Sequence, residues 1–510
     1  MSENSKEGVS CLRLGIDLGT TFSAGAYINT ADEPEIIINK EGGRLMPSVV
    51  YFEDCNKVIV GEAAKENSIL YPRRVISAVK NYMGKKVDFP MENGKSYTPE
   101  EISAFILRKL VNDATEYAGQ DVEGVVITIP AYFTDAQRKA TEDAAKIAGI
   151  RLLATINEPT AAAIYYAHKL RLEGNANVMV YDLGGGTFDV TIIQIKQSDI
   201  VVKSTHGLAN VGGKFFDQDI VDYVCDYLME KHNIDLEEEE YLDEYQELIL
   251  KAENCKIQLS SKNSANIIIK IGRIKESIPI TKELFEDKVK KFYNRSVISM
   301  KKALRDSGLT FDDLDKIILV GGSSKIPYIS QQIQNLTGKQ PSKEVNPDEA
   351  VALGAALYSN MLMEDVNESS IIDVCSHSIG VVVIDNLKNK QKVNHILIPR
   401  NSSLPCGVEQ IFYTTVNNQK AIELSVTEGE FKELSDVTTL FTSIIDLPEK
   451  LPAGTEVKIR LELDKNQLLH IYCEIPSVQL SEEFTIKRDA NMDDEELNEL
   501  MGLIANYEIN

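Results

Sequence analysis

The feature that most constrains this chain is a glycine-rich turn that occurs twice, each time between two extended segments. The first copy reads Asp-Leu-Gly-Thr-Thr at residues 17–21, and the second reads Asp-Leu-Gly-Gly-Gly-Thr at residues 182–187. Glycine lets backbone N–H groups approach an anion, threonine hydroxyls add donors, and an aspartate at a strand end can hold hydrated Mg²⁺. The repeat therefore predicts two related half-domains that close on the phosphates of a nucleotide.

Each turn leads into a strand and not into a helix, which excludes the P-loop and the dinucleotide fingerprint. The segment most like a P-loop, residues 207–215, has Gly213 in place of the lysine and Phe215 in place of the Ser or Thr. A single turn of this type is most often only a hairpin turn, so the prediction depends on the duplication. A third glycine pair, Gly321-Gly322, is either part of the same site or a tight strand-to-helix connection.

The composition is that of an ordinary globular chain with an excess of acid. The 510 residues are 43% apolar and 26% charged, and their net charge is -24. At about 150 residues per domain this length predicts two to four domains, and the acid excess argues against nucleic acid and anionic membranes as partners. The 7 cysteines form no Cys-x-x-Cys pair, and we find no export signal or membrane-spanning run, so a cytoplasmic protein with reduced thiols is expected.

The hydrophobic pattern changes near residue 370. Residues 12–358 alternate short β-branched runs with longer helical patterns, which is typical of α/β layering. Beyond residue 370 the period is two, which predicts a β-sandwich. One stretch, residues 455–464, alternates without a break and places four apolar residues on one face: Val457, Ile459, Leu461 and Leu463.

Several helix starts are marked by explicit capping residues. Thr98, Thr134 and Asn346 each precede an acid or amide three positions later, which predicts three capped helix starts. After residue 489 the chain has room for a single short helix, expected around residues 493–505.

Five segments of the chain resemble the signatures of one protein family. They read GIDLGTT at residues 15–21, INEPTAAA at 156–163, DLGGGTFD at 182–189, VGGS at 320–323 and NPDEA at 346–350. In this order they closely resemble the DnaK-type, seventy-kilodalton heat-shock chaperone family, and the resemblance extends from about residue 12 to residue 489. It includes LIPRNSSLP at residues 397–405, which is similar to the substrate domain of that family.

The resemblance implies the fold class and the domain bounds. It implies an α/β actin-like (ribonuclease-H-like, duplicated) ATPase domain at residues 11–368, a linker at 369–376 and a β-sandwich peptide-binding domain at 377–489. A short helical segment at 490–510 stands in place of the long helical lid of the family. Because slow release requires a covered peptide, a groove without a lid should release peptides quickly.

Carried over position by position, the resemblance implies the roles of the nucleotide-site residues. Lys80 matches the catalytic lysine that contacts the transferred phosphate and orients water, and Asp17 and Asp182 hold Mg²⁺ through water. Glu158, Asp189 and Thr187 complete the catalytic group. The positions that bind ATP or ADP are Gly19, Thr20, Thr21, Gly184, Gly185, Gly186, Gly212, Gly213, Glu253, Lys256, Ser260, Gly321, Gly322, Ser323 and Asp348.

The resemblance also implies positions outside the nucleotide site. Pro130, Arg138 and the linker residue Asp373 correspond to positions that transmit the nucleotide state between the domains. On the residues alone, Pro130 is equally a strand end and Arg138 a solvated helix residue. The implied peptide groove contains Phe412, Ile422 and Leu424, although alternation alone predicts ordinary sandwich core for the last two equally well.

The sequence departs from the family pattern at several of these places. Ile257 and Lys325 replace two arginines that stack on the adenine, and Lys214 replaces a glutamate that contacts the ribose. Planar guanidinium stacking is lost, so weaker and less adenine-selective binding is expected. The linker has only two isoleucines before Asp373, which predicts weaker coupling. Two groove positions, Asn394 and Thr415, are polar, which alters the expected peptide preference.

The function that these observations predict is an ATP-dependent chaperone that binds extended apolar peptide segments of unfolded proteins, with hydrolysis modulating peptide affinity. By resemblance its partners are client polypeptides, a J-domain cochaperone and a nucleotide-exchange factor. Two other functions stay open: a non-cycling accessory protein with a structural nucleotide, and an actin-like metabolite kinase. The kinase would not need the β domain.

Overall fold

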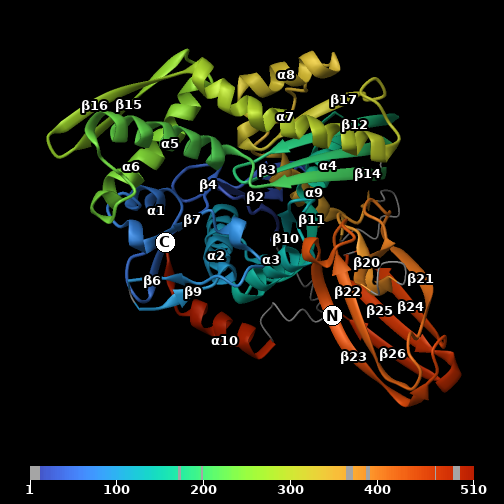
Figure 1. Ribbon diagram of the computed structural model, residues 1–510. Helices are drawn as coiled ribbons and strands as arrows, with labels where there is room; N and C mark the ends of the chain where they lie inside the picture. Colours follow the sequence, from blue (N-terminus) through green and yellow to red (C-terminus); the bar gives the residue numbers. More distant parts are fainter. Residues whose placement is uncertain are drawn as a thin grey trace, which may run out of the picture.

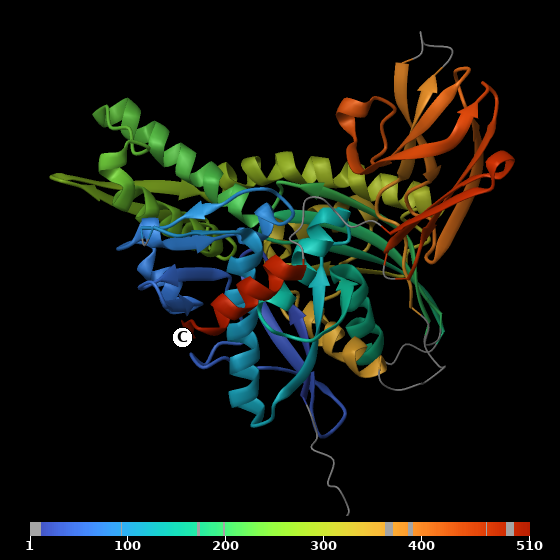
Figure 2. The same ribbon diagram turned by 90° about the horizontal axis from the view of Figure 1, so that it is seen from below.

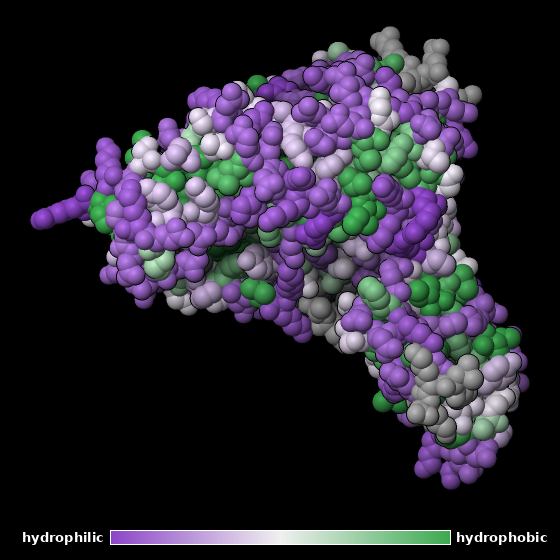
Figure 3. Space-filling model, turned by 45° about the horizontal axis from the view of Figure 1, so that its top comes forward, coloured by the Kyte–Doolittle hydropathy of each residue, from purple (hydrophilic) through white to green (hydrophobic). Residues whose placement is uncertain are grey.

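The computed structural model describes residues 12–92, 94–170, 174–196, 199–362, 371–385, 391–465, 467–485 and 494–510. Two α/β lobes lie side by side, and a β-sandwich projects from one end of them (Figures 1 and 2). The space-filling view shows the sandwich as a separate mass beside the lobes, with hydrophobic patches on its surface (Figure 3).

The first lobe is built on a six-stranded sheet in the order β11-β10-β1-β2-β3, with β4 paired to β2. A second sheet, in the order β27-β6-β5-β7, contains the last strand of the chain next to early ones. The strands of the first lobe are β1 Leu12–Asp17, β2 Phe22–Ile28, β3 Pro34–Ile36, β4 Met46–Pro47, β5 Val49–Phe52, β6 Lys57–Val60, β7 Val75–Ser77, β8 Phe89–Pro90, β9 Ser96–Tyr97, β10 Val122–Ile129, β11 Leu152–Asn157 and β27 Glu508–Ile509. Its helices are α1 Glu62–Asn67, α2 Pro99–Ala118 and α3 Asp135–Ile147.

The second lobe is built on a five-stranded sheet in the order β17-β12-β13-β14-β18, and a separate hairpin joins β15 and β16. Its strands are β12 Asn175–Leu183, β13 Thr187–Lys196, β14 Asp199–Ala209, β15 Ser264–Ile271, β16 Ile274–Thr281, β17 Lys316–Val320 and β18 Ile371–Ile372. The remaining helices of the two lobes are α4 Glu158–Leu170, α5 Gly213–His232, α6 Leu242–Leu259, α7 Lys282–Ser307, α8 Pro327–Thr337 and α9 Ala350–Met361.

The two lobes repeat one motif around the two glycine-rich turns. In the first lobe, β1 pairs parallel with β10 and antiparallel with β2. In the second lobe, β12 pairs parallel with β17 and antiparallel with β13. Each predicted turn therefore joins two antiparallel neighbours at the same place in its sheet, which confirms the duplicated half-domains and the α/β part of the prediction.

Two of the three predicted capped helix starts are confirmed. The side chains of Thr98 and Thr134 each accept a hydrogen bond from the backbone N–H three residues later, and the residue at that position bonds back, so both are capping boxes. At Asn346 the side chain accepts a hydrogen bond from the N–H of Asp348 at 3.3 Å, but the helix does not start there. Helix α9 begins only at Ala350, because residues 346–349 form a turn in which the carbonyl of Asn346 accepts from Glu349 and Ala350.

Small residues allow α4, α9 and β1 to pack closely where the lobes join. A Cβ at Gly354 of α9 would lie 1.8 Å from the carbonyl oxygen of Ala161 in α4. A Cβ at Gly15 of β1 would lie 2.1 Å from the backbone nitrogen of Ala356. The backbones of these three elements are therefore in direct contact, which fixes the position of α4 relative to the first strand.

The β-sandwich consists of two four-stranded antiparallel sheets, in the orders β20-β19-β22-β23 and β21-β24-β25-β26. The four residues predicted on one face of residues 455–464 are all buried between the sheets, which confirms that face. The strands are β19 Ile379–Asp385, β20 Gln391–Ile398, β21 Cys406–Tyr413, β22 Gln419–Glu428, β23 Thr438–Leu451, β24 Glu456–Leu463, β25 Leu469–Ile475 and β26 Leu480–Thr485.

The ends of the sandwich connect to different lobes. Before the sandwich, β18 of the linker pairs parallel with β14 and so extends the sheet of the second lobe. After the sandwich, helix α10 (Asp494–Ala505) and strand β27 lie against the first lobe (Figure 1). The short helix expected at residues 493–505 is thus present within one residue of its predicted start.

Gly354→Ala should lower the free energy of unfolding by about 1–3 kcal/mol, because the added methyl group forces α4 and α9 apart. Denaturant unfolding followed by circular dichroism would measure the change. Gly502→Ala in α10 is the matched control, since its Cβ meets open space, and it should raise stability by up to about 1 kcal/mol. Equal effects of the two substitutions would contradict the close packing.

Candidate functional site

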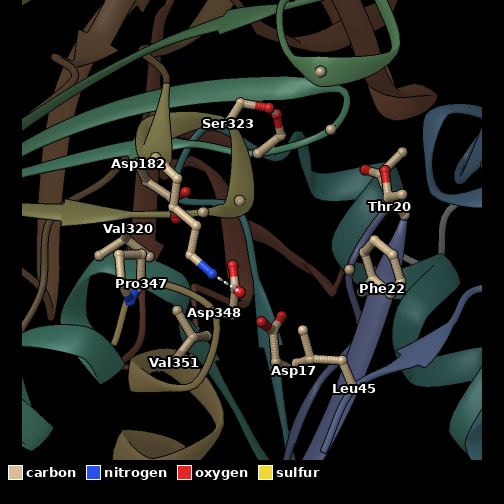
Figure 4. Close-up of a pocket in the computed structure, with 18 of the residues that line it drawn as sticks. Asp17, Thr20, Phe22, Leu45, Asp182, Val320, Ser323, Pro347, Asp348 and Val351 are labelled. Carbon is tan, nitrogen blue, oxygen red and sulfur yellow. Dashed lines mark hydrogen bonds and ion pairs between the residues drawn. The ribbon is translucent and has the colours of Figure 1, made fainter. Parts of the chain in front are cut away.

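A cavity of about 450 Å³ lies between the two lobes, where their glycine-rich turns meet. Asp17 enters it from the end of β1 and Thr20 from the turn that follows, whereas Ser323 enters from the opposite side (Figure 4). Most residues that the sequence predicted for the nucleotide site line this cavity: Asp17, Gly19, Thr20, Thr21, Lys80, Glu158, Asp182, Gly184, Gly185, Thr187, Gly213, Glu253, Lys256, Ser260, Gly321, Gly322, Ser323 and Asp348. Gly186, Gly212 and Asp189 lie behind this lining.

The glycine-rich turns pack against each other so closely that no side chain would fit. A Cβ at Gly185 would lie 2.1 Å from Oγ1 of Thr21 in the other turn. Gly212 has φ +147 and Gly321 has φ +79, and a Cβ at either would lie 2.5 Å from a carbonyl oxygen of residues 183–184. The hydroxyl of Ser323 donates to the carbonyl of Gly184 at 2.7 Å, which ties the third glycine turn to the second. All three turns thus form one wall of backbone.

The floor of the cavity contains a buried ion pair. Nζ of Lys80 lies 2.5 Å from Oε1 of Glu158, and both side chains are buried. Lys80 is on a short 3-10 turn at residues 79–82, after Ala78, whose φ of 57 is left-handed. Glu158 is the first residue of α4, directly after β11. The pair therefore joins elements that are far apart in the sequence.

Three aspartates surround this pair, and their pKa values are raised. Burial and the nearby Glu158 raise the pKa of Asp17 to about 7, even though the hydroxyl of Thr128 donates to it at 3.2 Å. The same two causes raise the pKa of Asp189 to about 7 and that of Asp182 well above its ordinary value. Oδ1 of Asp189 is buried and has no hydrogen-bond partner. One ammonium group thus faces an excess of carboxylate charge.

The carboxylates suit a hydrated divalent cation better than a directly ligated one. Among the described residues, no three His, Cys, Asp or Glu side chains converge on one metal position. Mg²⁺ typically keeps several waters and uses one or two carboxylates together with phosphate oxygens. Asp17 and Asp182, which both line the cavity, fit this pattern.

The outer part of the cavity differs from the floor. Lys65 of α1 pairs with Glu253 of α6 at 2.6 Å, which bridges the two lobes, and Lys256 pairs with Asp217 at 2.7 Å. Lys325 pairs with Asp348, so its charge is already engaged. Ile257 is 58% exposed on the cavity wall. The outer part of the cavity therefore offers the apolar face of Ile257, together with lysines that are already paired with carboxylates.

Lys214 does not line the cavity, and its ammonium reaches across to the first lobe. Nζ of Lys214 donates to Oγ of Ser77 at 3.3 Å. Burial lowers the pKa of Lys214 to about 8, although Glu253 and Asp217 nearby favour its charged form. This contact and the Lys65–Glu253 pair both bridge the two lobes.

Sequence reasoning missed several residues of the cavity. Phe22 and Leu45 line it from the first lobe, and Ile326 and Val351 from the second. The ammonium of Lys65 lies 5.3 Å from the ring centre of Phe22. Phe22 directly follows the first glycine-rich turn, which was a usable signal, whereas only the fold brings Leu45 and Lys65 to this place.

The three predicted interdomain residues lie at the base of the linker. Arg138 is buried, and its guanidinium donates to Oδ1 of Asn157 at 3.1 Å and to Oγ of Ser376 at 3.2 Å. Asn157 and Thr160 donate to Oδ2 of Asp373, at 2.8 Å and 3.3 Å. Pro130 is buried at the end of β10. Arg138 is thus not the solvated residue that its helix pattern also allowed.

The sandwich contacts the lobes beyond the linker. Nη2 of Arg400 lies 2.6 Å from Oδ2 of Asp306, and the N–H of Thr205 donates to Oδ1 of Asn401 at 2.9 Å. The rings of Tyr132 and His377 have centres 4.2 Å apart. Helix α7, strand β14 and the start of α3 therefore all take part in docking the sandwich.

The predicted groove residues have different surroundings. Phe412 and Ile422 are half-buried at the edge of the sandwich core. Leu424 is 4% exposed and belongs to that core, so it has little surface to offer a peptide. Asn394 is also buried and bonds to Thr427 and to the carbonyl of Phe431, whereas Thr415 is exposed.

The fold and the site together define a class of protein. Two related α/β lobes enclose a cavity lined by glycine-rich turns, as in the actin-like ATPase fold, and a linker joins them to a β-sandwich. The family model described as Hsp70 protein matches residues 13–92 and 87–508. The chain belongs to the Hsp70 family, which consists in general of ATP-dependent chaperones that bind ATP or ADP with Mg²⁺. Among the described residues, no helix has the length and apolar character needed to cross a membrane.

The raised pKa of Asp189 predicts how the stability of the nucleotide-free protein changes with pH. The folded protein keeps a proton on this carboxyl up to about pH 7, whereas the unfolded chain loses it near 3.8. Folding therefore binds protons in this interval, and the free energy of unfolding falls as the pH rises from about 4 to about 7. In Asp189→Asn the fall should be smaller, as measured by urea unfolding at several pH values.

The exposed Asp312→Asn is the control for this experiment and should keep the pH dependence of the original chain. A slope that is the same in all three proteins would show that Asp189 is already ionised at low pH in the folded state.

Proposed function

We propose that this chain hydrolyses ATP and uses the nucleotide state to change its hold on extended apolar peptide segments. The observation that carries the proposal is the buried Lys80–Glu158 pair between two interlocked glycine-rich turns. Family membership supports the general part, an ATP-dependent chaperone. Beyond this general part, we propose the roles of the individual residues and a peptide affinity that depends on the nucleotide state.

In this mechanism the chain contributes positioning and charge, which are what phosphoryl transfer requires. Lys80 places its ammonium against the transferred phosphate and orients the attacking water, while Glu158 holds the lysine in place. Asp189, which is buried behind the cavity lining, adds negative charge near Glu158 and Lys80. Thr20, Thr21 and Thr187 donate hydroxyls to phosphate oxygens. When bound through Asp17 and Asp182, Mg²⁺ neutralises part of the phosphate charge.

One peptide unit connects the site to the linker. Glu158 pairs with Lys80 in the cavity, and the preceding residue Asn157 bonds to both Arg138 and Asp373. A shift of Glu158 on hydrolysis therefore moves the group that holds the linker aspartate. We infer that this is the route by which the nucleotide state reaches the sandwich.

The sandwich supplies the peptide site. Half-buried Phe412 and Ile422 are suited to receive an apolar side chain, and β21, which carries Phe412, is an edge strand of its sheet and so can offer backbone pairing. Client polypeptides, a J-domain cochaperone and a nucleotide-exchange factor are the partners that we propose from family membership.

A second function, a non-cycling accessory protein with a structural nucleotide, is favoured by one specific observation. Lys325 is held by Asp348 and Ile257 offers only an aliphatic face, so no described cation is free to stack on a base at these two positions. The linker strand β18 also contributes only two residues to the sheet of the second lobe. The experiment below separates the two functions.

Lys80→Ala should lower the rate of ATP hydrolysis by a factor of about 10²–10³, because it removes the main cation that faces the transferred phosphate. In the same variant, turnover of Mg-ATP should no longer change the dissociation rate of a fluorescently labelled apolar peptide. Single-turnover hydrolysis and stopped-flow peptide release are the measurements. Lys85→Ala, at an exposed position of the same segment, is the matched control and should behave as the original chain.

Peptide release that does not respond to Mg-ATP in the original chain would favour the accessory protein. Failure to bind any apolar peptide, together with tight binding of a small polyol, would favour the metabolite kinase.

Ile257→Arg should tighten nucleotide binding, because a guanidinium at this exposed cavity position can stack on the base. A gain of about 1 kcal/mol, or roughly five-fold in Kd, is expected for such a contact. Titration calorimetry with ADP measures it. Ile268→Arg is the matched control, since Ile268 is 50% exposed but lies outside the cavity, and it should leave Kd unchanged. An equal gain in both variants would indicate a general charge effect and not stacking.

A further inference from the structure

The segment after the sandwich does not lie on the sandwich. Helix α10 packs on α2 and α3 of the first lobe, and Figure 1 shows it well away from the orange strands of the sandwich. Leu497 is 2% exposed and Ile504 is 1% exposed, and both belong to the core of that lobe. The guanidinium of Arg108 in α2 donates to the carbonyl of Ile504 at 2.7 Å, close to the end of the helix. The helix is therefore part of the first lobe by packing.

Beyond the helix the chain adds a strand to the second sheet of the first lobe. β27 pairs parallel with β6, with Glu508 opposite Lys57 and Ile509 opposite Val58. The N–H of Glu508 donates to the carbonyl of Asn56 at 2.9 Å, and the N–H of Asn510 donates to that of Val58 at 3.0 Å. In return the N–H of Val60 donates to the carbonyl of Asn510 at 2.8 Å. The edge of β6 is thus paired by the segment itself.

Tyr507 anchors the connection between the helix and the strand. Its hydroxyl lies 2.9 Å from that of Tyr97 and accepts from Nζ of Lys95 at 2.9 Å. Its ring meets that of Phe105 edge-on, with centres 5.1 Å apart. Side-chain packing, backbone pairing and polar contacts thus hold one segment in place, which is typical of a specific attachment.

The same lobe helix serves both attachments of the sandwich. Helix α3 carries Arg138 against Ser376 of the linker, and the N–H of Asp135 points to Glu428 of the sandwich at 3.4 Å. Ala140, Ala144 and Ile147 of α3 belong to the core that contains Leu497. Figure 2 shows α10, the red helix, lying across the first lobe and apart from the orange-red sandwich. α3 is therefore held between the sandwich and α10.

The connection limits how far the sandwich can move. β26 ends at Thr485 and α10 begins at Asp494. At about 3.5 Å per residue, the chain between them spans at most roughly 30 Å. While α10 and β27 stay in place, the end of β26 at Thr485 cannot move beyond this reach, even if the contacts of the linker were lost.

We propose that residues 494–510 are a docking element that holds the sandwich to the first lobe by a second route, independent of the linker and of the nucleotide. Its docking surface consists of α2, α3 and the edge of β6. The element is the short helical segment that was expected in place of the lid, and it acts as a fixed anchor. The proposal requires neither hydrolysis nor peptide binding, so it can fail or hold independently of the proposed function.

Hydrogen exchange of β6, measured by mass spectrometry on the full chain, tests the docking. In the original chain a peptide covering residues 57–60 should stay protected to the same degree with Mg-ADP, with Mg-ATP and without nucleotide. Glu508→Pro removes the N–H that bonds to Asn56 and should speed exchange there at least ten-fold. Glu508→Ala loses the same exposed side chain but keeps the N–H, so its exchange should stay within two-fold.

Small-angle X-ray scattering of the same proteins tests the anchoring. The radius of gyration of the original chain should not change with the nucleotide, whereas Glu508→Pro and a chain that stops at residue 493 should expand with Mg-ADP. Loss of β6 protection when one nucleotide replaces the other would overturn the proposal, because the element would then move with the cycle. Unchanged protection in Glu508→Pro, or equal dimensions of all variants, would overturn it as well.

Discussion

The nucleotide site depends on a buried excess of negative charge. Lys80 is already paired with Glu158 at 2.5 Å, and Asp17, Asp182 and Asp189 lie near this pair with raised pKa values. Burial and mutual repulsion both disfavour ionisation of these carboxylates, which raises their pKa values. A ligand that brings its own cation relieves this repulsion. In the glycine-rich turns a Cβ at Gly185 would lie 2.1 Å from Oγ1 of Thr21, so glycine is needed there, and its backbone N–H group stays open to phosphates next to that cation.

The same charges are connected mechanically to the linker. Glu158 begins α4 and follows Asn157, which receives the guanidinium of Arg138 and donates to Asp373. The close packing of α4 on α9 at Gly354 restricts the movement of α4. A displacement of Glu158 would therefore also displace the residues next to it. In the proposed function, coupling by way of these buried hydrogen bonds would let a linker whose strand β18 pairs at two residues with β14 report the state of the cavity.

Much of the fold could be predicted because the pattern of each segment is local. The duplicated turns, the alternation of residues 455–464 and the capping boxes at Thr98 and Thr134 all depend on nearby residues. Asn346 failed for a local reason, since its carbonyl closes a turn before the helix begins. The contacts that sequence reasoning missed are not local. Nothing near Lys65 points to Glu253, and the helical pattern of Arg138 does not show that the linker covers it. Leu424 shows the converse, because alternation predicts burial but not which face of a strand meets a peptide.

The position of α10 changes what kind of motion can accompany a nucleotide cycle. A sandwich attached at one end can separate from the lobes over a large distance, whereas one attached through both the linker and α10 can only rotate or shift within the reach of the chain between Thr485 and Asp494. Helix α3 contacts both attachments, so movements of α3 alter the contact of Glu428 and the bond of Arg138 to Ser376 together. In such a molecule the nucleotide acts by small displacements at the start of α3, where Asp135 and Arg138 lie. In the proposed function, the sandwich edge near Phe412 that we assign to the peptide would then open or close without separation of the domains.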